Sequence, residues 1–220
     1  SAVALGVGDD CALINVPDGH QLAVTTDTLV AGVHFPEDGN PSLIARRALR
    51  VNLSDLAAMG AAPLGFQLAL TLPAMNENWL KSFSDGLSID ARNFSCPLIG
   101  GDTTRGALSI TITMMGAVPR GRALLRSGAR VGDVICVSGT LGDSAQALQQ
   151  LSHSRAEDYL NTRYWLPQPR LALGELLRSR ASAALDISDG LAQDLGHIAK
   201  SSGLTAVIDA SLLPLSTELR

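Results

Sequence analysis

The chain has 220 residues, of which 46% are hydrophobic and only 17% charged, so its composition excludes a disordered protein and suits one large core or two modest ones. A net charge of −4 argues against a general nucleic-acid binder, which usually carries a basic face. No apolar run approaches the roughly 20 residues that a membrane-spanning helix needs, and no signal peptide is evident, so we expect a cytoplasmic protein without a membrane partner.

The cysteines and the ends of the chain give two further predictions. Cys11, Cys96 and Cys136 lie far apart in apolar surroundings and form no CxxC pair, which predicts reduced core residues. The chain does not begin with Met and shows no end signal after Glu218, so we expect a piece of a longer protein.

Turn and capping residues in the sequence predict the first strands and the first helix. Apolar runs at 12–16 and 21–26 flank a Pro-Asp-Gly turn and indicate a β-hairpin. Asn40-Pro41-Ser42 predicts the start of a helix that Ser42 caps and that Gly60 ends after about Met59.

Alternation and amphipathicity predict the elements that follow. Apolar residues on every second position indicate half-buried strands at 66–72 and 108–114. Residues 76–93 have the pattern of an amphipathic helix, and 98–99 reads as a short strand that ends in Gly100-Gly101-Asp102. The first half of the chain is therefore predicted to be an α+β domain, residues 1–120.

A Gly- and Arg-rich stretch between residues 120 and 131 has no periodicity and predicts a domain boundary. The second domain, residues 121–220, is predicted to alternate strands with helices, as in an α/β layer. Its expected strands are 133–138, 182–187 and 207–208, and its expected helices begin at Asp143, after Pro169 and near Asp189.

Seven of the 21 acidic residues fall in five short motifs rich in Gly, Ser and Thr. The motifs are Gly8-Asp9-Asp10, Thr25-Thr26-Asp27-Thr28, Asn52-Leu53-Ser54-Asp55, Gly100-Gly101-Asp102-Thr103 and Asp186-Ile187-Ser188-Asp189-Gly190. Several follow an apolar strand directly, so the carboxylates are expected on loops at strand ends. A single Asp beside Gly is more often a turn or a cap than a ligand, but five such motifs in one chain favour a common site.

Carboxylates that converge must have their repulsion offset, and divalent cations do this best. Ligands that are all oxygen favour Mg²⁺, Mn²⁺ or Ca²⁺, and Mg²⁺ usually completes its shell with water and substrate phosphates. The sequence has no Walker loop and no protein-kinase signature, and its two lysines, Lys81 and Lys200, lie away from every Asp motif. The cations that handle phosphate are therefore expected to be metal ions or arginines.

The whole set of motifs, in this order, resembles the thiamine-monophosphate kinase family, within an ATP-binding superfamily that includes aminoimidazole ribonucleotide synthetase, selenophosphate synthetase and a hydrogenase maturation protein. The resemblance covers essentially the whole chain. It is carried by the stretches GVGDDCAL (6–13), TTDTLVAGVHF (25–35), VNLSDLAAMGA (51–61), IGGDTTRG (99–106), GRALLRSGA (121–129) and ALDISDGLAQDLGHI (184–198).

The resemblance implies transfer of the γ-phosphate of ATP to thiamine monophosphate with several Mg²⁺ ions. It implies a homodimer in which the N-terminal sheets join into a barrel, followed by an α/β domain that is incomplete here. By the same resemblance, the positions that hold metal are Asp10, Thr25, Thr26, Asp27, Asp55, Asp102, Asp186 and Asp189. Gly101, Asp102, Arg126 and Ser188 match positions that contact ATP, and His34 matches one at the thiamine-phosphate site. No residue is assigned as a general acid or base.

Two other functions stay open from the sequence alone. The first is another enzyme of the superfamily, although a selenophosphate synthetase would be expected to place a reactive Cys in a flexible glycine-rich loop, whereas Cys11 opens an apolar strand. The second is a dimeric nucleotide-binding module without turnover.

Overall fold

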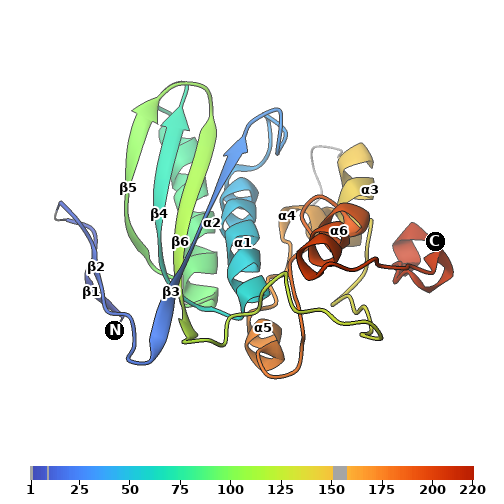
Figure 1. Cartoon of the computed structure of the whole chain (residues 1–220). Coiled ribbons are helices and arrows are strands. Elements are labelled where there is room, and N and C mark those ends of the chain that lie inside the picture. The colour runs from blue at the N-terminus through green and yellow to red at the C-terminus, as the bar shows by residue number, and fades with distance from the viewer. Residues whose placement is uncertain (1, 9, 151–157) are drawn as a thin grey trace.

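The computed structural model describes residues 2–8, 10–150 and 158–220. Its centre is a four-stranded sheet in the order β3-β6-β4-β5 (Figure 1). The strands are β3 His20–Val30, β4 Ala62–Leu72, β5 Leu98–Arg105 and β6 Ser109–Pro119. β4 and β5 run parallel, and the other two pairs are antiparallel.

The hairpin predicted from residues 12–16 and 21–26 is wrong. β2 (Leu13–Ile14) pairs instead with β1 (Val3–Leu5) in a small separate ribbon. The second apolar run belongs to β3, which pairs with β6 from His20↔Pro119 to Val30↔Ser109. This pairing buries one alternating face of both long strands, which a short hairpin could not do.

Helices α1 (Pro41–Met59) and α2 (Glu77–Asn93) cover one face of the sheet and leave the other open (Figure 1). The cap of α1 differs from the prediction: the side chain of Asn40, not of Ser42, accepts hydrogen bonds from the backbone N–H groups of Ser42 and Leu43. Pro41 then occupies the first helical position, where its missing N–H costs nothing. Gly60 ends the helix in the left-handed conformation, as predicted.

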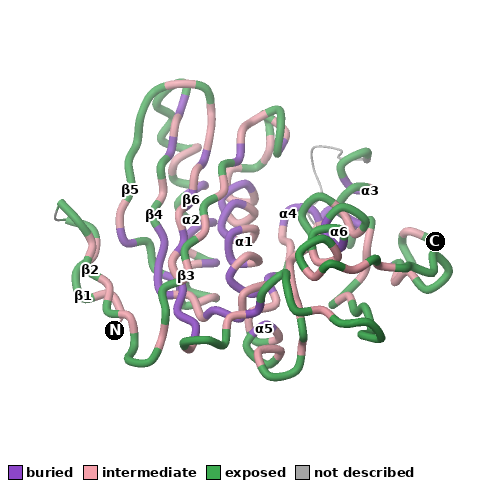
Figure 2. Tube along the Cα trace, in the orientation of Figure 1, coloured by how far each residue is buried: buried purple, intermediate pink, exposed green. Residues whose placement is uncertain are grey.

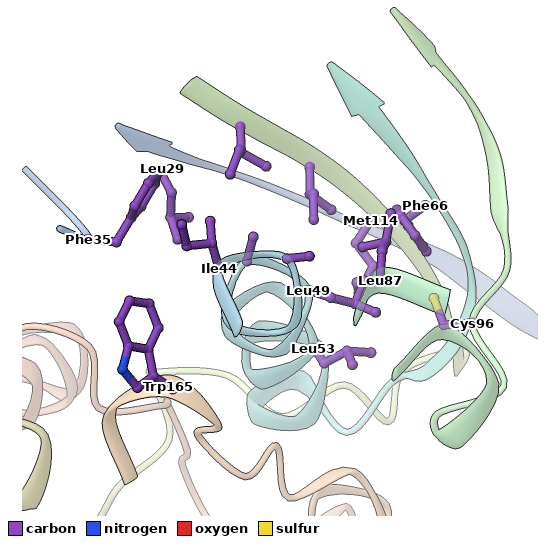
Figure 3. Packing of buried hydrophobic residues seen from close by; sticks show 14 of the residues in the cluster. Leu29, Phe35, Ile44, Leu49, Leu53, Phe66, Leu87, Cys96, Met114 and Trp165 are labelled. Carbon is purple, nitrogen blue, oxygen red and sulfur yellow. The ribbon is translucent and has the colours of Figure 1, made fainter. Parts of the chain in front are cut away.

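The core forms around α1, in which every residue is buried or half-buried (Figure 2). Ile44, Leu49 and Leu53 point from α1 into a cluster that includes Phe66 and Met114 of the sheet (Figure 3). These side chains are at most 2% exposed, so α1 is held by close packing against the sheet.

A buried ion pair network joins α1 to α2. Asp90 of α2 is fully buried and receives hydrogen bonds from Arg50 at 2.5 and 2.9 Å and from Arg46 at 3.2 Å. Burial alone would raise the pKa of Asp90, but the hydrogen bonds from Arg50 and Arg46 hold it below its ordinary value. The network therefore depends on an ionised carboxylate.

The second half of the described chain consists of helices and extended segments. The helices are α3 Asp143–Gln150, α4 Tyr159–Trp165, α5 Leu171–Leu177 and α6 Leu191–Ser202, with 3₁₀ turns η1 Ala210–Leu212 and η2 Thr217–Leu219. α4 and α5 pack on α1: the guanidinium of Arg47 lies 4.1 Å from the ring centre of Tyr164. In α5, a Cβ on Gly174 would meet the carbonyl oxygen of Ala57 at 2.0 Å.

The strands predicted at 133–138, 182–187 and 207–208 are wrong, because within the described residues none of them forms a ladder. Val134 and Val207 are 84% and 85% exposed. An extended apolar run becomes a strand only where another strand satisfies its backbone groups, and no described segment does so here. The mixed α+β class is confirmed, and the sheet is open in the single chain.

Two smaller expectations have mixed outcomes. Cys96 is buried, and burial raises the pKa of its thiol to about 12, but Cys11 and Cys136 are exposed rather than in the core. Across the described ranges, no helix is long and apolar enough to span a membrane.

We predict that Asp90→Ala destabilises the protein by about 3–5 kcal/mol, because it leaves two largely buried guanidinium groups without their partner. Denaturant unfolding measures this loss. The matched control is Asp85→Ala in the same helix: its carboxylate forms an exposed pair with Lys81, and its removal should cost far less stability. Equal losses in both variants would contradict the role of the buried network.

Candidate active site

The alternation of β3 distributes the first Thr-Asp motif over both faces of the sheet. Thr25 and Asp27 are half-buried on the face that the helices cover. Thr26 lies on the open face, where its hydroxyl donates to Oγ1 of Thr113 at 3.0 Å. Neighbouring residues of one strand therefore serve two different surfaces.

Three carboxylates from three elements form what we call the carboxylate cluster: Asp27 of β3, Asp55 of α1 and Asp186 of the segment before α6. The hydroxyl of Thr25 donates to Oδ2 of Asp55 at 2.5 Å. Ser54 forms a side-chain hydrogen bond with Asp186. Helix α1 thus supplies one acid, Asp55, and through Ser54 anchors another, Asp186, that lies 132 positions after Ser54 in the chain.

The electrostatics of the carboxylate cluster differ from those of Asp90. Burial raises the pKa of Asp27, and repulsion from Asp186 adds to it while His34 opposes it. Burial also raises the pKa of Asp55, against a hydrogen bond from Thr25 and the charge of Arg126, with Asp27 adding to the rise. The pKa of Asp186 is raised by burial and then by Asp55. The charges of these three acids are therefore undercompensated by the protein itself.

This arrangement fits a divalent cation. The donor atoms are carboxylate and hydroxyl oxygens, which Mg²⁺ prefers, and a cation would relieve the repulsion that raises the three pKa values. In the part of the chain that the structure describes, no three His, Cys, Asp or Glu side chains alone have the arrangement of a metal site. The missing ligands would be expected from water or phosphate, as is usual for Mg²⁺.

A second group of predicted residues lines a groove on the open face of the sheet. The groove has a volume of about 390 Å³ and lies between the loop that carries Asp10 and the strand that carries Asp102. The backbone N–H of Thr103 donates to the Asp102 carboxylate at 2.8 Å. Asp9, the neighbouring acid of the first motif, lies outside the described residues.

The Gly-Gly-Asp motif lies inside β5, not at a strand end as the sequence suggested, and Asp27 likewise lies inside β3. The reason is a close backbone approach: a Cβ on Gly101 would meet the carbonyl oxygen of Leu68 at 1.9 Å. Only glycine permits this parallel pairing of β5 with β4, and the pairing places Asp102 beside Ala69 in the groove.

The remaining predicted residues come from segments around these two sites. Arg126 is exposed and its charge acts on Asp55, while its carbonyl oxygen accepts from the Ser202 hydroxyl at 3.4 Å. Ser188 and Asp189 are exposed in the loop before α6. His34 is exposed, and its Nδ1 accepts a hydrogen bond from the Val30 N–H at 3.0 Å.

Two residues of this region were missed from the sequence. Ser54 precedes Asp55 in its motif and binds Asp186, and Asp194 follows Gly190 by four positions and accepts three backbone hydrogen bonds from the loop. Asp194 could have been noted from the sequence, because it is a polar residue within about one turn of the predicted helix start.

Comparisons with known proteins identify the family of this chain. Residues 8–118 match the family described as AIR synthase related protein, N-terminal domain. The chain is 54% identical over 223 residues to the thiamine-monophosphate kinase of Escherichia coli K12, covering 99% of this chain and 69% of that protein. It belongs to the thiamine-monophosphate kinase family.

Solved structures of the thiamine-monophosphate kinase family have the same fold. The enzyme from Stenotrophomonas maltophilia K279a is 49% identical with a TM-score of 0.93, over 100% of this chain and 73% of that one. AaThiL, in complex with AMPPCP and TMP, is 33% identical with a TM-score of 0.86, over 92% of this chain and 67% of that one.

We predict that Asp186→Asn leaves the metal-free protein as stable as before or raises its melting temperature by up to about 4 °C at pH 7. The folded pKa of Asp186 is raised, so its ionised form is disfavoured by folding, and the cost is present above that pKa and absent below the unfolded value. Thermal melts at pH 7 and pH 4 measure this, and any gain should shrink at pH 4. A large loss of stability at pH 7 would show that the Asp186 charge is already compensated.

Proposed function

We propose that this chain carries out ATP-dependent phosphorylation of thiamine monophosphate to thiamine diphosphate. The identity of 54% to an enzyme named for that activity, over nearly the whole chain, carries the proposal. AaThiL, at 33% identity, forms a complex with AMPPCP and TMP, and AMPPCP is an analogue of ATP. The carboxylate cluster and the groove support the proposal, because acids and an open groove suit the cations and phosphates that such a reaction brings together.

We propose Mg²⁺ as the cation, held by acids and hydroxyls from both sites. The residues proposed to contribute are Asp10, Thr25, Thr26, Asp27, Asp55, Asp102, Asp186 and Asp189. When bound, the Mg²⁺ ions would screen the charge between the two phosphate-bearing substrates and stabilise the charge that develops during transfer.

In this proposal the protein's own side chains bind phosphate and transfer no proton. The attacking atom is a phosphate oxygen of thiamine monophosphate, which is largely deprotonated at pH 7 because a monoester's second pKa is about 6. No residue therefore needs to act as a general base. Arg126 is proposed to bind phosphate oxygens of ATP, and its electrostatic effect on Asp55 supports a place near the carboxylate cluster.

Gly101, Asp102 and Ser188 complete the proposed ATP contacts. Gly101 lets the β5 backbone lie close to β4 without a side chain, so that the groove stays open above it. His34 is proposed to contact thiamine monophosphate through its Nε2, because its Nδ1 accepts the hydrogen bond from the Val30 N–H.

We also propose a homodimer and a division into two domains. Residues 1–120 contain all four strands of the main sheet, whose open face exposes Leu22 and Val24 by 48% and 58%. A second copy of this sheet would cover these side chains. Residues 121–220 would form the second domain, which contributes Arg126 and Asp186 to the site.

The turnover prediction concerns Asp102. The complete gene product should release ADP from Mg-ATP only when thiamine monophosphate is present, and Asp102→Asn should lower this turnover by about 100-fold or more, since it removes an anionic ligand. An asparagine can still accept the Thr103 N–H, so the fold should survive. A coupled ADP assay and a thermal melt measure both quantities.

Asp18→Asn is the matched control, because Asp18 is an exposed turn residue of the same half of the chain. It should turn over at the wild-type rate. Near-normal turnover by Asp102→Asn would remove Asp102 from the site, and ADP release that does not depend on thiamine monophosphate would contradict the proposed reaction.

For the dimer, light scattering at micromolar concentration should give twice the monomer mass for the wild type. Val24→Lys should shift the protein toward monomer, because it places a charge in the centre of the proposed contact. Val134→Lys alters a valine that is 84% exposed in the second half and should leave the dimer intact. A monomeric wild type would refute the proposed assembly.

A further inference from the structure

Asp194 is a buried carboxylate outside the residues that the proposed site uses. It lies in the first turns of α6 and is 4% exposed. Its Oδ2 accepts backbone hydrogen bonds from Ser188 at 3.0 Å and from Asp189 and Gly190 at 3.1 Å. Among the residues that the structure describes, no basic side chain forms an ion pair with Asp194, so these amides and the N-terminal end of α6 compensate its charge.

The three N–H groups form the kind of nest that ordinarily binds an anion at the start of a helix. The N-cap residue, Gly190, has no side chain to fill it, and its φ of 119° allows the sharp turn into α6. Asp194 reaches back from within the helix and fills the nest instead. The nest is therefore closed to phosphate as long as Asp194 stays in place, and the loop backbone is tied to α6.

The loop that Asp194 holds carries two acids of the proposed site. Asp186 enters the carboxylate cluster from one end of it, where Ser54 hydrogen bonds to it. Asp189 lies at the other end, and Gln193 donates to its Oδ2 at 2.9 Å. The position of the loop backbone thus determines how Asp186 lies relative to Asp27 and Asp55.

We propose that Asp194 is a positioning residue: by filling the amide nest of Ser188, Asp189 and Gly190, it fixes the loop that brings Asp186 to the carboxylate cluster, and so sets the affinity of the site for Mg²⁺ and nucleotide. This inference rests on the proposed function of the carboxylate cluster as a metal–nucleotide site. Asp194 is not among the residues proposed to contact substrate or metal, so its proposed effect on the site passes through the loop.

The test compares Asp194→Ala and Asp194→Asn with the wild type in the complete gene product. Hydrogen exchange of the amides of residues 188–190 is measured without metal or nucleotide. The Kd for AMPPCP is measured at fixed Mg²⁺, and the Mg²⁺ dependence of turnover is measured with ATP and thiamine monophosphate. Circular dichroism establishes that each variant is folded.

In Asp194→Ala, exchange at the three amides should accelerate. The AMPPCP Kd and the half-saturating Mg²⁺ concentration should each rise by about 10- to 100-fold, the range for loss of a group that orients metal ligands. The kcat at saturating Mg²⁺ should fall much less, because the ligands themselves remain. Asp194→Asn should give values between those of the wild type and Asp194→Ala, since its side-chain carbonyl oxygen still accepts hydrogen bonds but carries no charge. If Asp194→Ala does not fold, the same measurements on Asp194→Asn test the proposal.

The control is Asp209→Asn, an exposed acid that accepts from the N–H and hydroxyl of Ser211 at the start of η1. It should change none of the three measurements. Unchanged amide exchange in Asp194→Ala overturns the proposal, as does faster exchange or a lower melting temperature with unaltered Mg²⁺ and AMPPCP affinity. If the wild type binds Mg-AMPPCP but does not phosphorylate thiamine monophosphate, the proposed function fails, and the exchange and binding measurements still decide on Asp194.

Discussion

The packing of α1 against the sheet is the constraint on which the rest of the molecule depends. One side of this helix is sealed by core residues such as Leu49 and Leu53, which are completely buried. Because those residues fix the rotation of the helix, they also fix where its polar residues lie. Asp55 is set beside the Thr25 hydroxyl, and Arg50 is set against Asp90 of the neighbouring helix. A rotation of α1 would disturb the core and both polar contacts together.

The buried and half-buried acids of this protein differ in how their charges are compensated. Asp90 and Asp143 are compensated: Asp90 by two arginines, and Asp143 by Ser216, Thr140, Arg163 and Tyr159, whose hydrogen bonds hold the pKa of Asp143 below its ordinary value although burial opposes them. Among the described residues, the carboxylate cluster has no comparable set of donors, and the pKa values of its three acids are raised. A carboxylate whose ionised form is disfavoured by folding is better explained by ligand binding than by stability, which is why we propose the cluster as a metal site.

The sequence was most informative where a single chain segment decides its own structure. Alternation predicted the strands near 66–72 and 108–114, and Gly60 marked the end of α1. It was least informative where pairing decides. The run at 21–26 belongs to a long strand beside β6, and residues 133–138 form no ladder. Local periodicity predicts neither outcome, because both depend on which other strand is available for pairing.

The same limit applies to the site. Acid motifs could be collected from the sequence, but not their division between the covered and open faces of the sheet, which follows from the β3–β6 register. The role of Ser54 depends on a contact with a distant segment that motif spacing does not show, whereas the position of Asp194 near a helix start was visible in the sequence and its loop contacts were not. Their part in binding, like that of the predicted ligands, stays a prediction.

The exposure of Cys11 has a consequence for covalent chemistry. Cys11 is an exposed thiol in the lining of the groove that also contains Asp102, whereas Cys96 is buried with a pKa of about 12 and carries almost no thiolate at neutral pH. An alkylating reagent or an oxidant would therefore modify Cys11 in preference to Cys96 and leave an adduct inside the groove. The protein thus carries a natural attachment point for a fluorophore at the place where a nucleotide is proposed to bind, and the same atom makes that place sensitive to oxidation.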